Sequence, residues 1–215
     1  MSPVMLYDVL IATAATLYMV IASTVFAIAI GLPLGTLLFS SDKIKPNPIL
    51  NKIIAAIINI SRSIPFIILL VALIPFTRLV VGSSIGIHAA MVPLTLGAAP
   101  FFARLVDNVY RSMSEGLVEA GFSMGASSWQ MIKHILLPEA TPQLIHAVTV
   151  TAITLVNYSA MAGTVGGGGL GDLAIRYGYQ RFNLPVMLTT VAILVIIVQA
   201  LQMIGDRLAK RLSHT

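Results

Sequence analysis

The amino-acid sequence predicts an all-α integral membrane protein with five membrane-spanning helices, in a single domain that covers residues 1–215. Hydrophobic residues make up 57% of the chain, charged residues only 10%, and the mean hydropathy is +0.93. Soluble domains are roughly half apolar and a quarter charged, so this composition indicates a lipid environment. Long uncharged stretches recur along the chain, and each is as long as the ~20 residues that a helix needs to cross the hydrocarbon layer.

The spans are expected at about residues 9–40, 53–77, 87–104, 141–164 and 185–206. Nothing basic precedes the first stretch, which is also far longer than the apolar part of a signal peptide, so we interpret it as a helix that is kept. The second stretch carries one formal charge, Arg62. The segment VVGSSIG before the third span is typical of a turn, and the last two spans lie inside uncharged stretches.

Lysine and arginine are unevenly divided between the two sides that these spans define. Nine basic residues fall on one side and three on the other. The nine are Lys43, Lys45, Lys52, Arg104, Arg111, Lys133, Arg207, Lys210 and Arg211; the three are Arg78, Arg176 and Arg181. Because cytoplasmic loops carry the excess of positive charge, the N-terminus is expected outside and the C-terminus in the cytoplasm.

Composition also excludes several kinds of site. The chain has no cysteine and four histidines without paired spacing, so we expect no disulfide and no metal site. The net charge of +5 follows from the loop asymmetry and does not indicate a nucleic-acid partner. The phosphate-binding pattern G-x-x-x-x-G-K-[ST] does not occur, so the chain is not expected to bind and hydrolyse ATP by itself.

One polar loop, at about residues 112–138, stands apart from the apolar spans and is expected in the cytoplasm. Ser112 with Glu115 and Ser127 with Gln130 each have the spacing of a capping box, and Gly125 between them suits the end of a helix. These signals predict two short amphipathic helices joined by a break.

Two interpretations of this helix pair are open. The pair could lie on the inner leaflet, but membrane-surface helices usually carry a face rich in lysine and arginine. Here the polar residues include Glu115 and Glu119 and a single lysine, Lys133. This charge pattern favours a groove on a partner protein over an anionic bilayer.

The same loop resembles the EAA signature of ABC importer permeases, which is EAA, three residues, G, nine residues and I-x-L-P. The matching residues are Glu119, Ala120, Gly121, Gly125, with Ala126 beside it, Ile135, Leu137 and Pro138. Gly121 replaces the usual alanine, a mild departure because both residues are small. The resemblance implies that these residues couple the chain to an ATPase and that Pro138 ends the second short helix.

Residues 61–108 and 157–183 are similar to permeases of the methionine uptake transporter family of ABC importers, and the similarity covers nearly the whole chain. It implies an ABC type I importer permease fold in the bacterial inner membrane, and a homodimer with the path on its two-fold axis. The implied partners are two cytoplasmic ABC ATPase subunits, which bind ATP and Mg²⁺, and an extracytoplasmic methionine-binding lipoprotein. This chain would then be a transporter subunit without a cofactor of its own. An importer of another amino acid or small polar solute is the alternative.

The end of the fourth span is a candidate for the solute path. An odd number of spans in a short chain favours a path between two copies. Asn157, Tyr158 and Ser159 supply polar groups there, and Met161 is a candidate gate, with ordinary core packing as the alternative for this methionine. The glycine-rich stretch 163–171 that follows fits close helix packing or a hinge.

Arg62 lies within the second span, where an unpaired arginine costs about 2.5 to 3.5 kcal/mol on insertion scales. Together with Ser63 and Pro65 it could mark a kink near the cytoplasmic mouth, or its side chain could simply extend to the membrane surface. The spacing of Asp107 from Arg104 and Arg111 predicts a solvated ladder of ion pairs.

Two other classes of membrane protein fit parts of the sequence. A secondary transporter driven by protons or sodium needs acidic residues inside the bundle, and here all eight are expected at span ends or in loops. A membrane aspartyl protease is suggested by Y-D at Asp8 and G-x-G-D at Asp172. Such an enzyme needs both carboxyls buried together, whereas these two are expected at the outer boundary.

Overall fold

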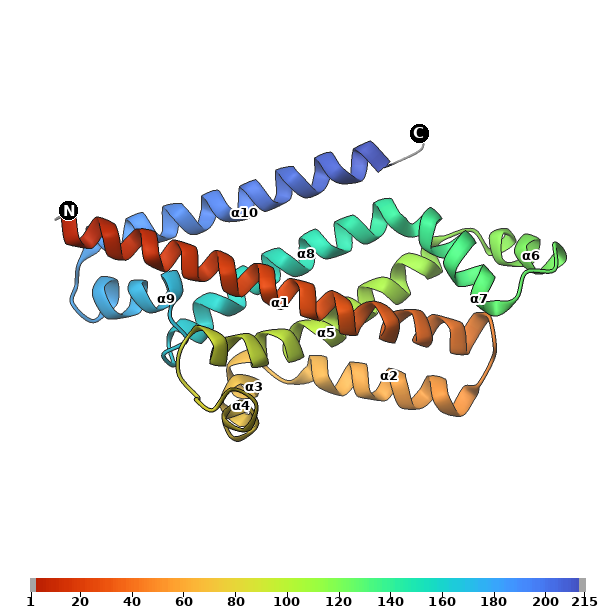
Figure 1. Cartoon of the computed structure of the whole chain (residues 1–215), viewed down its shortest axis with the longest axis horizontal. Helices are drawn as coiled ribbons and strands as arrows, with labels where there is room; N and C mark the ends of the chain where they lie inside the picture. Colours follow the sequence, from red (N-terminus) through yellow and green to blue (C-terminus); the bar gives the residue numbers. More distant parts are fainter. Residues whose placement is uncertain (1–2, 213–215) are drawn as a thin grey trace.

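The computed structural model describes residues 3–212 as a bundle of helices, with no strand in that range. The all-α prediction is therefore confirmed. Four long helices run roughly along the long axis of the molecule. In the view of Figure 1, α9 lies at one end, α6 and α7 lie at the other, and α2, α3 and α4 lie along the lower side. The helices are α1 (Pro3–Lys43), α2 (Pro48–Ser63), α3 (Phe66–Ala72), α4 (Ile74–Val81), α5 (Ile87–Ser112), α6 (Glu115–Ser123), α7 (Ser128–Gln130), the π-helix η1 (Met131–Leu136), α8 (Leu137–Gly163), α9 (Gly169–Leu173), the π-helix η2 (Ala174–Tyr179) and α10 (Leu184–Leu212).

Four helices in the described part are long and apolar enough to cross a membrane: α1, α5, α10 and the continuous helix Ser128–Gly163. The predicted span 53–77 is not one straight helix, because α2 and α3 meet at a bend of 100°. Proline lacks a backbone N–H and disfavours helical backbone in the residue before it. Ile64, which precedes Pro65, accordingly has extended angles of φ −83° and ψ 123°. The bent pair makes a fifth span if its two helices are counted together.

Helices α1 and α5 pack closely because two glycines of α1 face the backbone of α5. A Cβ atom on Gly31 would lie 2.6 Å from the Ala99 carbonyl oxygen, and one on Gly35 would overlap the carbonyl oxygen of Ala103. Small residues allow two helices to approach this closely. In lipid the hydrophobic effect does not bring helices together, so they associate through close packing of this kind. These two helices form the centre of the bundle.

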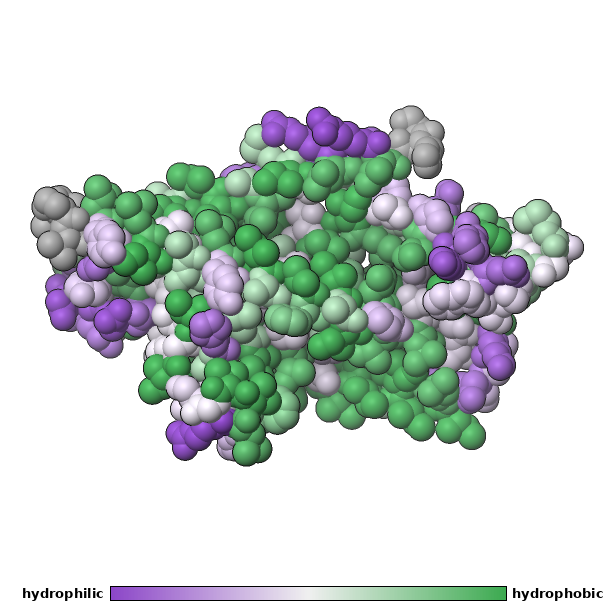
Figure 2. Space-filling model, viewed as in Figure 1, coloured by the Kyte–Doolittle hydropathy of each residue, from purple (hydrophilic) through white to green (hydrophobic). Residues whose placement is uncertain are grey.

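Buried apolar residues form three clusters among the described residues: a large one that includes residues of α1, α5, α8 and α10, a second towards the end that carries α6 and α7, and a small third one between α1, α2 and α5. The second cluster joins α1, α5 and η1 through Phe39, Phe102, Tyr110, Met131 and Leu136. Since Met131 and Leu136 are fully buried, η1 is packed firmly onto the ends of the long helices. On the face shown in Figure 2 the middle of the bundle is mostly apolar, and hydrophilic residues gather at the two ends and along the upper and lower edges. This pattern suits a protein surrounded by lipid.

The ion pairs of Asp107 differ from the solvated ladder that the spacing predicted. Both pairs form, since the Asp107 carboxylate accepts hydrogen bonds from Arg104 and Arg111 at 3.0 Å. However, α5 continues beyond the predicted end of its span and carries Asp107 into the interior, where its exposed fraction is 0%. Arg111 also donates to Asp42 of α1 at 2.8 Å. The cluster therefore ties α5 to α1.

Candidate functional site

Helices α6 and α7 project from one end of the bundle and are joined by a tight break (Figure 1). Gly125 follows the last turn of α6 with a left-handed φ of +80°. Its N–H donates to the Phe122 carbonyl at 2.9 Å, and the N–H of Ala126 donates to the Gly121 carbonyl at 3.1 Å. This is a Schellman motif, so the helix end predicted at Gly125 is confirmed.

The predicted capping box at Ser127 is also confirmed. The Gln130 N–H donates to the Ser127 hydroxyl at 3.4 Å, and the Ser127 N–H donates to the Gln130 side chain at 2.8 Å. The other predicted box is wrong: α6 begins after Ser114, and the Ser112 hydroxyl bonds to the Val109 carbonyl.

The sequence predicted that the second short helix ends at Pro138, and this prediction is wrong. Helices α7, η1 and α8 form one continuous helix from Ser128 to Gly163. The π-helical turn explains why proline is tolerated there, because the N–H of Leu137 donates to Ile132, five residues back, and the wider turn makes room before Pro138. Helix α7 is thus continuous with the long apolar helix α8.

The residues of the EAA signature divide between the surface and the interior. Glu119, Ala120 and Gly125 are exposed, whereas Gly121 is buried. A Cβ atom on Gly121 would overlap the end of the Met131 side chain and lie 2.9 Å from Cδ1 of Ile135, so the missing side chain lets α6 rest on η1. Ala126, Ile135 and Leu137 are partly buried, and Pro138 is exposed.

Large apolar side chains cover the tip of this projection. The exposed fractions are 77% for Met124, 68% for Trp129 and 40% for Phe122. The sequence predicted two amphipathic helices here, but only the fold shows which apolar residues pack against the bundle and that those at the tip are left uncovered. Exposed apolar residues in a polar setting are typical of a protein interface.

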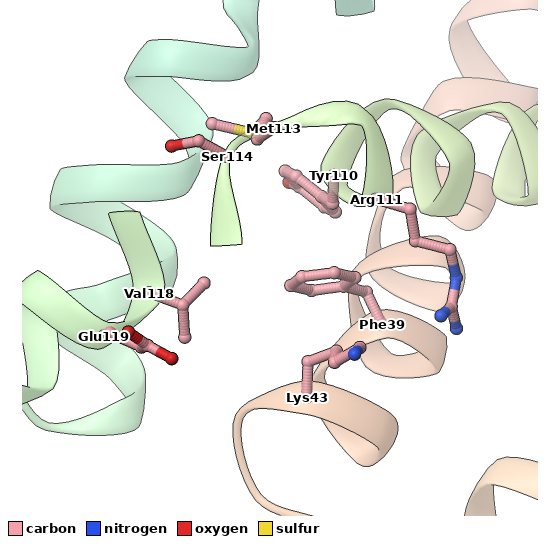
Figure 3. A pocket seen from close by; sticks show the side chains of 8 residues that line it. All are labelled: Phe39, Lys43, Tyr110, Arg111, Met113, Ser114, Val118 and Glu119. Carbon is pink, nitrogen blue, oxygen red and sulfur yellow. The ribbon is translucent and has the colours of Figure 1, made fainter. Parts of the chain in front are cut away.

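A cavity of about 390 Å³ opens beside this projection. In Figure 3, Val118 and Glu119 of α6 face Phe39 and Lys43 of α1 across it, with Tyr110 of α5 at its edge. The walls combine aromatic, cationic and acidic side chains. Sequence reasoning identified Glu119 but missed the other walls, because they come from helices distant in the chain.

The candidate path residues lie near the other end of α8. Asn157 and Met161 are exposed, Met161 by 43%, and Tyr158 is partly buried. Ser159 is buried, and its hydroxyl donates to the Val156 carbonyl at 2.7 Å. Two residues along a helix correspond to a turn of about 200°, so Ser159 points away from the face that carries Asn157 and Met161.

The structure brings the Arg62 bend next to Tyr158. Phe66, in α3, stacks on the Tyr158 ring with centroids 4.2 Å apart and an interplanar angle of 3°. Arg62 and Tyr158 line one small cavity together with Phe101 of α5. Ser63 and Pro65 are exposed at the bend, outside this cavity. Phe66 and Phe101 were not identified from the sequence, since nothing in their local pattern distinguishes them from core residues.

The glycine-rich stretch is closely packed. A Cβ atom on Gly163 would overlap the backbone N of Asp172. The Asp172 carboxylate accepts hydrogen bonds from Arg176, at 2.5 Å from Nη2 and 2.8 Å from Nε, and this bonding raises the pKa of Arg176. Asp172 is thus paired with a permanent cation, which is unlike the proton-sharing carboxyl of an aspartyl protease.

Comparison with known proteins gives consistent matches. The family model described as "Binding-protein-dependent transport system inner membrane component" matches residues 27–214. A Vibrio cholerae protein named "Probable D-methionine transport system permease protein MetI" is 51% identical over 207 residues, which is 95% of this chain and 92% of the relative. The Escherichia coli K12 "D-methionine transport system permease protein MetI" is 54% identical over 150 residues, or 69% of each chain.

Solved structures match over the full length. A chain from "Inward facing conformations of the MetNI methionine ABC transporter" has a TM-score of 0.98 and 49% identity, with 100% of both chains covered. A chain from an amino acid ABC transporter solved with histidines has a TM-score of 0.76 at 18% identity, covering 97% of this chain and 94% of the other. This second likeness concerns the fold alone.

Proposed function

The chain belongs to the family of binding-protein-dependent transport system inner membrane components, and from this membership we propose that it is the permease subunit of an ATP-driven methionine importer. Relatives about half identical over 95% of the chain are named as permeases of D-methionine transport. L-methionine and D-methionine are the proposed cargo. The chain has no phosphate-binding motif of its own, so ATP and Mg²⁺ are assigned to a separate ATPase subunit.

The main structural support for the proposal is the projecting pair of helices α6 and α7. Its tip is apolar and exposed, its break is held by a Schellman motif, and α7 continues without interruption into α8. We assign the tip, with Glu119 beside it, to a groove on the ATPase. Movement of that groove would tilt α8 as a rigid body, because a continuous helix transmits displacement at its end.

The path is assigned to the interface between two copies of the chain. Asn157 and Met161 are exposed on one face of α8, while Ser159 is buried and is left out of this assignment. A two-fold axis beside this face would place the two copies of Met161 opposite each other. Two ATPase subunits at the α6–α7 end and a methionine-binding lipoprotein at the other complete the proposed importer. The α6–α7 end and the C-terminus are assigned to the cytoplasm, as the distribution of basic residues predicts.

The proposed function is tested by reconstitution in vesicles. Vesicles that hold this chain with its ATPase, and that are supplied with the binding protein and ATP, are expected to accumulate labelled methionine. Vesicles without the ATPase, or with a hydrolysis-deficient ATPase, should not. Equal uptake in the absence of the ATPase would contradict the proposal, and competition by other unlabelled amino acids would show whether methionine is the preferred cargo.

The position of Met161 is tested by crosslinking. Since the chain has no cysteine, Met161→Cys introduces a single thiol. In the closed state the two thiols are expected to form a disulfide across the dimer, which requires Cα atoms within about 7 Å. A cysteine at Leu188, which is exposed on α10, serves as the control. If Met161→Cys gives no crosslinked dimer with any nucleotide, the residue does not line the two-fold axis.

A further inference from the structure

Arg62 has a solitary position in the bundle. Arg104, Arg111 and Arg176 are each paired with a carboxylate. Among residues 3–212, by contrast, the exposed side chain of Arg62 forms no hydrogen bond, ion pair or ring contact. It also lies in the last turn of α2, immediately before the bend. An unpaired ionisable residue at membrane depth is costly to place and is therefore a candidate for a functional group.

The cavity beside Arg62 differs from a lipid-facing groove. Its volume is about 120 Å³, and it lies where α2, α3, α5 and α8 meet, with walls that include Ser61, Phe66, Phe101 and Tyr158. Such a volume admits several water molecules or the polar end of a small solute. The Arg62 side chain therefore lines a cavity between helices and also lies on the surface of α2.

The chemistry of the walls suits an amino acid that has an apolar side chain. A guanidinium group binds a carboxylate with two parallel hydrogen bonds. The aromatic rings of Phe66, Tyr158 and Phe101 lie beside it. Aromatic rings make favourable contacts with a thioether sulfur, and they also attract an ammonium group.

We propose that the cavity between Arg62 and Tyr158 is a carboxylate-binding subsite that holds the amino-acid cargo during its passage through the permease. Arg62 binds the cargo carboxylate, and the rings of Phe66, Tyr158 and Phe101 contact its apolar side chain. The inference rests on the proposed function. Tyr158 connects the subsite to the assigned path, because its neighbour Asn157 and the nearby Met161 are exposed on the same helix.

The subsite is tested by removing and restoring the charge in the complete complex. Arg62→Gln is expected to lower ATP-driven methionine uptake at least about tenfold, since hydrogen bonds to a charged group contribute roughly that factor or more. Arg78→Gln is the matched control: Arg78 is exposed and bonds only to the Ser84 hydroxyl among the described residues, and its replacement should leave uptake unchanged.

Arg62→Cys extends the test, because this thiol is the only one in the chain. Modification with a thiosulfonate reagent that adds an aminoethyl group restores positive charge and is expected to recover uptake, while the sulfonatoethyl reagent should not. Methionine should slow the modification. The wild-type complex is treated with the same reagents as a control, because any change in its uptake must come from thiols of the partner subunits.

Three outcomes would overturn the inference. Equal uptake by wild type and Arg62→Gln would refute the subsite and leave the proposed function intact. A defect that varies with the anionic lipid content of the vesicles, without protection by methionine, would assign Arg62 to a lipid phosphate. Failure of the wild-type complex to take up methionine would refute the proposed function together with the subsite.

Discussion

Gly125→Pro is expected to reduce ATP-driven uptake by at least about tenfold and to leave the protein inserted in the membrane. Proline holds φ near −65°, whereas Gly125 needs +80°, and proline has no N–H to donate to the Phe122 carbonyl. The Schellman motif would therefore be lost. Helix α6 would no longer end at this point, and the tip assigned to the ATPase groove would change shape.

The measurement compares methionine uptake with ATP hydrolysis in reconstituted vesicles. Uptake should fall while insertion and dimer formation remain normal. Gly116→Ala is the matched control, since Gly116 lies within α6 with no atom close enough to meet a Cβ. Uptake by Gly125→Ala should lie between that of Gly125→Pro and that of Gly116→Ala, because a left-handed backbone costs a non-glycine residue roughly 1 to 2 kcal/mol. Full transport by Gly125→Pro would show that this break has no part in coupling.

Asp107→Ala is expected to destabilise the protein by about 3 kcal/mol, because it leaves two arginines without their buried partner. The carboxylate is completely buried and is the shared acceptor of Arg104 and Arg111. For a chain of this size the apparent melting temperature in detergent should fall by roughly 6 to 12 °C. The lower stability should come from weaker packing of α5 against α1.

Asp42→Ala is the control for this measurement. Asp42 also pairs with Arg111, but its side chain is 40% exposed, and exposed ion pairs contribute little. Asp107→Asn keeps the shape and one acceptor, so its melting temperature should be intermediate. A melting temperature of Asp107→Ala equal to that of the wild type would mean that the cluster does not hold the helices together.

Local features were predicted well because they depend on neighbouring residues. Uncharged stretches identify long apolar helices, since the cost of charge in lipid acts on every turn. The end of α6 at Gly125 and the capping box at Ser127 involve residues at most five positions apart, so their spacing in the sequence was sufficient. Pro65 likewise indicated a break in the second span, although the 100° angle did not follow from it.

Features that depend on contacts between distant segments were decided only in three dimensions. Asp107 and Ser159 are both buried because of how their helices pack against the rest of the bundle. Pro138 continues a helix because a π-turn and the packing of η1 accommodate it. Arg62 and Tyr158 share a cavity although nearly one hundred positions separate them. The physical reason is the same in each case: local sequence determines where a helix forms and which residues suit lipid, while burial and pairing depend on which helices pack together.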